Sequence, residues 1–170
     1  MARINGHVER LRAARDRIVA LQVAADATPL PPEESATGHP WLAREILAHA
    51  AEMLPYWMGE VERVLAADTS AGPVPFGRTA ADEIRTKTVD RDRTLPLTEL
   101  YSRINASVDR ISPLLLRVDD ATCARPILHS TLGVMSLEDA VERFMSGHLE
   151  EHCGQLEQAL GVEAATSDQL

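Results

Sequence analysis

Apolar residues recur at intervals of three and four along most of the 170-residue chain. These intervals keep side chains on one face of a helix, so the pattern predicts amphipathic helices. The first covers about residues 5–26 and ends before the segment TPLPPEESATG, because proline cannot continue a helix. A second long helix opens at GHPWLAREIL, where Pro40 suits the first helical position. Pro55 lies inside its pattern and predicts a kink or break within residues 51–55.

The second half of the chain contains a shorter helical piece and two further long helices. The short piece is TAADEIRTKTVDRD, which follows a loop, TSAGPVPFG. The third long helix covers residues 97–118, with Thr98 as its cap and a disturbance at Pro113. The connection that follows, TCARPILHSTLGVM, is the one plausible extended stretch and is too short to build a sheet.

Ser136 begins the fourth helix with SLED, a capping box that has Asp in place of Glu. This helix runs to Leu160, where Gly161 stops it. Four amphipathic helices joined by long or broken connections predict an all-α four-helix bundle with long crossovers. The length suits one domain, with its core in residues 5–160 and a flexible tail in residues 161–170.

The charge of the chain narrows the range of partners. Seventeen basic against twenty-six acidic residues give a formal charge of -9, which repels nucleic acid. The arginines between residues 10 and 17 alternate with acidic and apolar residues and indicate a solvated helix face. Without a signal-peptide core or a long apolar run, the expectation is a cytoplasmic protein that does not bind membranes. Cys123 and Cys153 are then expected to be reduced.

Two histidines continue the inward-facing stripe of the fourth helix. His148 and His152 follow Phe144 and Met145 on this stripe and lie four residues, about one turn, apart. That spacing lets two imidazoles bind one metal ion, although the HxxxH pattern alone is common. Buried neutral imidazoles need partners for their ring nitrogens, and a metal satisfies one nitrogen on each. The alternative is that both are ordinary polar residues on a solvated face.

His49 provides an independent third candidate, because it lies on the inner stripe of the second helix. A lone histidine on an apolar face is usually a core residue with satisfied hydrogen bonds. Three inward histidines from two helices are instead typical of metal sites in bundle cores. Gly147 adds a smaller indication, since glycine in mid-helix costs roughly 1 kcal/mol relative to alanine. Close approach of a neighbouring backbone would offset that cost; simple tolerance is the alternative.

Few other residues are candidates for the chemistry. His129, in the loop before the last helix, could act as an acid or base, and otherwise makes a loop contact. Glu52, three residues after His49, could hydrogen-bond that imidazole or act as a base, and otherwise is a solvated carboxylate. Cys153 adjoins His152 and points about 100° away around the helix. It is therefore a poor fourth ligand and is expected to fill space between helices.

These segments resemble the DinB-like family of helical bundles, which includes the YfiT-type proteins and the metal-binding domain of mycothiol-dependent maleylpyruvate isomerase. The matching segments are WLAREILAHAAEMLPYW and LHSTLGVMSLEDAVERFMSGHLEEHCGQLEQAL, and the resemblance spans roughly residues 5–160. It implies a divalent metal held by His49, His148 and His152, with zinc or nickel favoured because imidazole suits both. It also implies homodimers and, for several members, transfer or isomerisation chemistry that uses low-molecular-weight thiols.

Two functions from different classes follow. The first is a metal-dependent transferase or isomerase that acts on a small electrophile with a low-molecular-weight thiol, and metal-assisted hydrolysis would use the same site. The second is a non-catalytic, metal-stabilised protein that binds a small molecule or serves in a stress response. An open ligand position on the metal favours the enzyme, whereas four protein ligands favour the second function.

Overall fold

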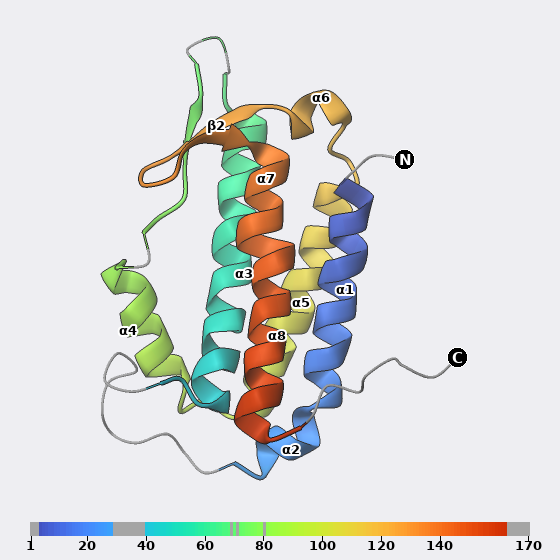
Figure 1. Cartoon of the computed structure of the whole chain (residues 1–170), viewed down its shortest axis with the longest axis vertical. Helices are drawn as coiled ribbons and strands as arrows, with labels where there is room; N and C mark the ends of the chain where they lie inside the picture. Colours follow the sequence, from blue (N-terminus) through green and yellow to red (C-terminus); the bar gives the residue numbers. More distant parts are fainter. Residues whose placement is uncertain (1–3, 29–39, 69, 71, 80, 163–170) are drawn as a thin grey trace.

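The computed structural model describes residues 4–28, 40–68, 70, 72–79 and 81–162. Four long helical elements lie side by side and form the bundle that the sequence predicts (Figure 1). They are α1 (Ile4–Ala20), α3 (Ala43–Ala66), α5 (Leu97–Leu115) and a rod made of α7 (Leu137–Val141), a π-helical segment (Glu142–Ser146) and α8 (Gly147–Leu160). Among the described helices, none is both long and apolar enough to cross a membrane.

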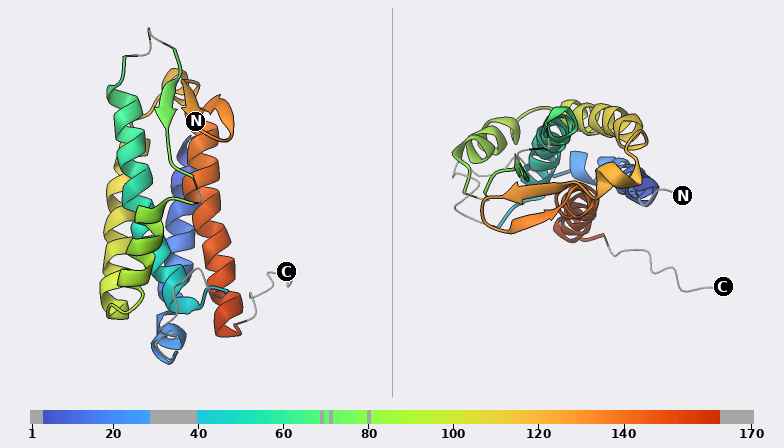
Figure 2. Two further views of the ribbon diagram at one scale, coloured as in Figure 1. Left: turned by 90° about the vertical axis from the view of Figure 1, so that its left-hand side faces the viewer. Right: turned by 90° about the horizontal axis from the view of Figure 1, so that it is seen from above.

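The directions of the four helices require one long crossover connection. α1 and α3 each contact both α5 and α8, so the four elements surround a shared apolar core. α3 and α5 run in one direction, and α1 and the α7–α8 rod run in the other (Figures 1 and 2). The chain must therefore return along the bundle between α3 and α5. β1 (Val74–Phe76) and α4 (Glu83–Asp92) lie on this return, and α4 packs along α3.

The ends of the last helical rod follow the predicted capping chemistry. Ser136 Oγ accepts a hydrogen bond from the Asp139 N–H at 3.0 Å, and the Asp139 carboxylate accepts one from the Ser136 N–H at 3.3 Å. This is the predicted capping box. Gly161, at φ +65°, ends α8 in the left-handed conformation that glycine adopts without strain.

The first two predicted helices differ from the structure in their ends. A turn at Leu21 separates α1 from the short α2 (Gln22–Asp26), and the prolines that follow lie outside the described residues. α3 begins at Ala43, so Pro40 precedes the helix instead of opening it. Of the kink or break predicted at Pro55, the break is wrong, because α3 continues through this residue. Pro55 is exposed, and the buried residues before and after it, Leu54 and Trp57, keep α3 packed on the core.

The cap predicted for the third long helix is also wrong. Pro96 is the N-cap of α5, and Thr98 lies within its first turn. α5 ends at Leu115, two residues after Pro113 and three residues before the predicted end. Pro113 is therefore accommodated in the last turn and does not interrupt the body of the helix.

A three-stranded sheet, which the sequence did not predict, lies at one end of the bundle. β2 (Pro126–His129) pairs in antiparallel fashion with β3 (Gly133–Ser136) and in parallel with β1. The helical turn α6 (Asp120–Cys123) precedes β2. The stretch that the sequence predicts to be too short for a sheet thus forms a hairpin and pairs with β1, where the sequence predicts a loop. Strands of three and four residues are too short to show a periodic pattern.

Gly147 is required by the π-helical segment. Its N–H bonds to the carbonyl of Glu142, five residues earlier. A Cβ on Gly147 would lie 2.8 Å from that carbonyl oxygen and 3.1 Å from Oε1 of the same glutamate. The close approach predicted from the sequence therefore exists, but it involves the preceding turn of the same rod and not a neighbouring helix.

Gly147→Ala should therefore lower the free energy of unfolding. The backbone oxygen of Glu142 must move, at a cost of about 1–3 kcal/mol that outweighs the higher helix propensity of alanine. Gly154→Ala is the matched control, because no atom lies within 4 Å of the position of its Cβ. The control should gain up to about 1 kcal/mol. Urea denaturation measures both variants, and equal stabilisation by the two substitutions would contradict this account.

Candidate metal centre

His49 from α3 and His148 and His152 from α8 bring their Nε2 atoms together inside the bundle. His148 Nε2 lies 3.1 Å from His152 Nε2 and 3.4 Å from His49 Nε2. One ligand atom from each residue lies within 4.8 Å of the others. Three nitrogens bound to one tetrahedral zinc at ~2.0–2.1 Å would be about 3.3 Å apart, so the observed spacing fits a shared ion. We call these three residues the histidine cluster.

An oxygen acceptor lies beside the outer nitrogen of every imidazole in the histidine cluster. The Nδ1-to-oxygen pairs are His152 and Gln155 Oε1 at 2.9 Å, His148 and Glu151 Oε2 at 3.3 Å, and His49 and Glu52 Oε2 at 3.6 Å. The last distance exceeds a hydrogen bond, and the contact is electrostatic. Acceptors at Nδ1 favour the tautomer with hydrogen on that atom, which directs the Nε2 lone pairs at the centre of the cluster.

Burial favours the uncharged form of the three imidazoles. Loss of hydration lowers the pKa of His49 and of His148. It lowers the pKa of His152 to about 3, and the two neighbouring histidines add to the effect. His148 Nε2 lies within hydrogen-bond distance of the other two Nε2 atoms, and a divalent cation between the rings would instead bond to a lone pair of each. The donor set therefore fits a metal ion.

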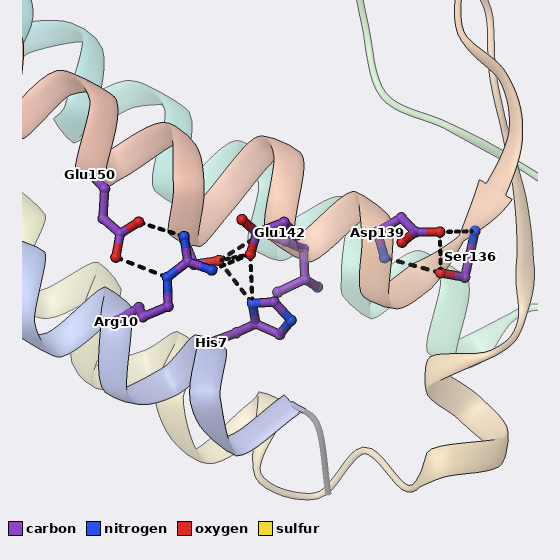
Figure 3. A network of polar contacts seen from close by, with 8 residues as sticks. His7, Arg10, Ser136, Asp139, Glu142 and Glu150 are labelled. Atoms are coloured by element: carbon purple, nitrogen blue, oxygen red, sulfur yellow. Dashed lines mark hydrogen bonds and ion pairs between the residues drawn. The ribbon is translucent and has the colours of Figure 1, made fainter.

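Arg10 of α1 binds the α7–α8 rod at a point close to the histidine cluster. Its guanidinium bonds to Glu150 Oε1 at 2.9 Å and also to Glu142, and His7 lies beside Glu142 (Figure 3). The two carboxylates lie on either side of Gly147, across the junction between the π-helical segment and α8. Because Arg10 binds on both sides of this junction, it ties α1 to the turn from which His148 projects. π-Helical turns of this kind occur frequently at functional sites.

Trp41, from the segment before α3, covers one side of the histidine cluster. Its ring centroid lies 5.0 Å from that of His49 and 6.2 Å from that of His152. His49 and His152 are buried, whereas 31% of the His148 side chain is exposed. His148 is therefore at the rim and is the member of the cluster that solvent reaches most easily.

A cavity of about 170 Å³ adjoins the exposed side of the histidine cluster. Trp57 and Phe144 form an apolar wall, with ring centroids 4.4 Å apart. The residues that line it are His49, Trp57, Arg78, Thr79, Arg85, Phe144 and His148. A larger cleft of about 500 Å³ shares Phe144 and His148 with this cavity. We call the smaller space the inner cavity and the larger one the outer cleft.

Glu52 lies behind His49, on the side of the imidazole away from the other two histidines. Arg78 bonds to its carboxylate at 2.6 Å and stacks over Tyr56, with 3.9 Å from the guanidinium carbon to the ring centroid. The contacts with His49 and Arg78 lower the pKa of Glu52 against the opposing effect of burial. Glu52 is therefore an ionised group placed to orient His49, and it is not directed at the centre of the cluster.

His129 does not reach the histidine cluster. Its Nε2 lies 3.2 Å from the carbonyl oxygen of Arg78, and the Thr131 N–H donates to its Nδ1 at 3.3 Å. Gly77 has φ +82°, and a Cβ there would lie 2.9 Å from the His129 ring. The structure thus places His129 in contact with the loop after β1, outside the lining of the inner cavity.

Four contributors to the site were not identified from the sequence: Glu151, Gln155, Arg78 and Arg85. The first two had a detectable signal, because each histidine of the cluster is followed three residues later by an acceptor, in HAAE, HLEE and HCGQ. The two arginines had none. They belong to the crossover between α3 and α5, and its path is a property of the tertiary fold.

The fold and the histidine cluster define a four-helix bundle with a candidate three-histidine metal centre. No protein-family model and no curated protein matches the sequence. The structure is similar to that of YfiT from Bacillus subtilis, described as a probable metal-dependent hydrolase with an unusual four-helix bundle topology. The similarity has a TM-score of 0.68 at 18% identity and covers 95% of this chain and 91% of YfiT. The chain therefore has the YfiT-type fold that the sequence resemblance predicts.

Neither cysteine should react readily in the native protein. Cys123 and Cys153 are free and buried, and neither belongs to the histidine cluster. Burial raises the pKa of Cys153 to about 11 and also raises the pKa of Cys123, so little thiolate forms at neutral pH. Iodoacetamide at pH 8, followed by mass spectrometry, should label both thiols in urea and very little in buffer. Rapid native labelling of Cys153 would show that it is accessible.

Proposed function

We propose that this chain is a metal-dependent enzyme in which one divalent ion, zinc or nickel, is held by His49, His148 and His152. The observation that supports this proposal is the convergence of three neutral imidazoles without a fourth protein ligand among the described residues. Structural zinc sites use four protein ligands, whereas catalytic sites use three and leave a position for a reactant. The arrangement therefore favours an enzyme over a non-catalytic, metal-stabilised binding protein.

The surroundings favour activation of a small nucleophile. A divalent ion in such a site supplies Lewis-acid chemistry and lowers the pKa of the nucleophile. Glu151 and Gln155 accept hydrogen bonds at Nδ1 of His148 and His152, and the charge of Glu52 favours the same tautomer of His49. Trp57 and Phe144 keep water from one side of the reacting group. The chain thus supplies orientation and a partly dry wall next to the ion.

Water and a thiol are the two candidate nucleophiles. The similarity to YfiT, described as a probable metal-dependent hydrolase, supports hydrolysis of a small electrophile. The outer cleft supports the thiol, because its volume of about 500 Å³ beside His148 can hold a low-molecular-weight thiol. We place hydrolysis first and thiol-dependent transfer or isomerisation second.

Substitution of the histidine cluster should remove the metal. Protein purified without chelator or affinity tag should contain about one divalent ion per chain, measured by inductively coupled plasma mass spectrometry. His49→Ala and His148→Ala should each retain little of it, because two imidazoles bind far less tightly than three. His7→Ala and His129→Ala are the controls and should retain the metal, since neither residue belongs to the cluster. Full retention with unchanged coordination in either cluster variant contradicts the proposal.

A cobalt-substituted protein should identify the nucleophile. In the thiol case, added low-molecular-weight thiols shift the visible absorption of cobalt by direct coordination and accelerate conversion of an electrophile. In the hydrolytic case, small esters are cleaved without thiol, and thiols act only as inhibitors. Either activity should fall by at least about 100-fold in His148→Ala, because several kcal/mol of charge stabilisation are lost. A metal that responds to neither thiols nor esters would favour the non-catalytic alternative.

A further inference from the structure

Arg85 of α4 extends toward the histidine cluster and lines the inner cavity with His49 and His148. In the part of the chain that the structure describes, no carboxylate lies within 4.0 Å of its guanidinium, and its buried Nε has no hydrogen-bond partner. The other arginine of the cavity differs, because Arg78 forms an ion pair with Glu52 at 2.6 Å. Of the two arginines that line the inner cavity, Arg78 is therefore in an ion pair and Arg85, among the described residues, is not.

The contacts that Arg85 does make leave its charge unbalanced. Its guanidinium carbon lies 5.4 Å from the centroid of the Trp41 ring, and this cation–π contact engages one face of the group. The N–H groups point along the plane of the guanidinium and are not satisfied by such a contact. Burial and the nearby charge of Arg78 lower the pKa of Arg85 more than the charges of Glu52 and Asp82 raise it, so its surroundings disfavour the cation. An arginine nevertheless stays protonated, and an anion would offset the cost.

We propose that Arg85 binds the carboxylate of a small-acid substrate whose reacting part lies over the histidine cluster. This inference rests on the proposed function and specifies its substrate class. A guanidinium presents paired N–H donors that match both oxygens of a carboxylate. The inner cavity, at about 170 Å³, has the volume of roughly six water molecules and suits an acid of a few carbon atoms.

The positive charge of the inner cavity contrasts with the negative charge of the whole protein. The chain carries a formal charge of -9 and therefore repels anions in general. In the inner cavity the balance is reversed, because its lining contains two arginines and no carboxylate. A divalent ion on the histidine cluster would increase the positive potential there. An acid would thus be oriented with its carboxylate on Arg85 and the remainder toward His148.

Ligand-observed NMR titrations of the metal-loaded and metal-free protein test this assignment. The probes are propionate, propionamide as its neutral match, and inorganic phosphate. Arg85→Gln should weaken propionate binding at least tenfold, or about 1.4 kcal/mol, with metal content unchanged. Arg85→Lys should fall between this variant and the native protein, because it keeps the charge and loses the paired donors. Lys87→Gln is the matched control, since Lys87 lies on the same helix, pairs with Glu83 and points to solvent.

The outcomes separate the two proposals. Equal propionate binding by the native protein and Arg85→Gln overturns the role of Arg85, as does propionamide binding as tightly as propionate. Tighter binding of phosphate than of propionate overturns the carboxylate assignment. If the native protein retains no metal, the proposed function fails, and the metal-free titrations still decide whether Arg85 binds the carboxylate. Circular dichroism tests whether each variant is folded. If Arg85→Gln does not fold, Arg85→Lys is compared with the native protein in its place.

Discussion

Three imidazoles, two of them buried and His148 at the rim, bring their Nε2 atoms to 3.1 and 3.4 Å, a spacing that fits one cation bonded to all three. Burial lowers the pKa of all three rings, which favours the uncharged form that binds a metal. Rotation of the His148 and His152 rings would separate their Nδ1 atoms from Glu151 and Gln155, and rotation of the His49 ring would weaken its electrostatic contact with Glu52. The packing of α3 against α8 fixes the positions of the three histidines, and the oxygen atoms beside Nδ1 fix the orientation of their rings. Both constraints favour metal binding at Nε2.

The last helical rod shows how the bundle maintains this arrangement. A π-helical turn changes the hydrogen-bond pattern just before His148, and Gly147 is the residue that tolerates the resulting close carbonyl. Arg10 then binds Glu142 and Glu150 on both sides of that turn (Figure 3). The Arg10 guanidinium lowers the pKa of Glu142, and the two carboxylates raise the pKa of Arg10. Because the guanidinium is partly exposed, we regard this contact as a determinant of orientation more than of stability.

The sequence was sufficient for the bundle and for the convergence of His49, His148 and His152, because helical periodicity reports directly which residues face the core. Residues whose placement depends on tertiary contacts were missed. β1 pairs with a strand about fifty residues later, and Arg85 reaches the histidine cluster only because α4 folds back along α3. The helix break expected at Pro55 is absent for the same reason, because packing of the whole helix overrides the low helix propensity of a single proline. The acceptor three residues after each histidine was present in the sequence and recognisable.

The central claim is that one ion binds three imidazoles and retains a position for a reactant. X-ray absorption spectroscopy of the zinc-loaded protein tests it most directly. The account predicts three imidazole nitrogens at ~2.0–2.1 Å and one further light atom that exchanges when a small anion is added. A sulfur ligand at ~2.3 Å in protein free of added thiol, or four protein ligands that do not exchange, would contradict it.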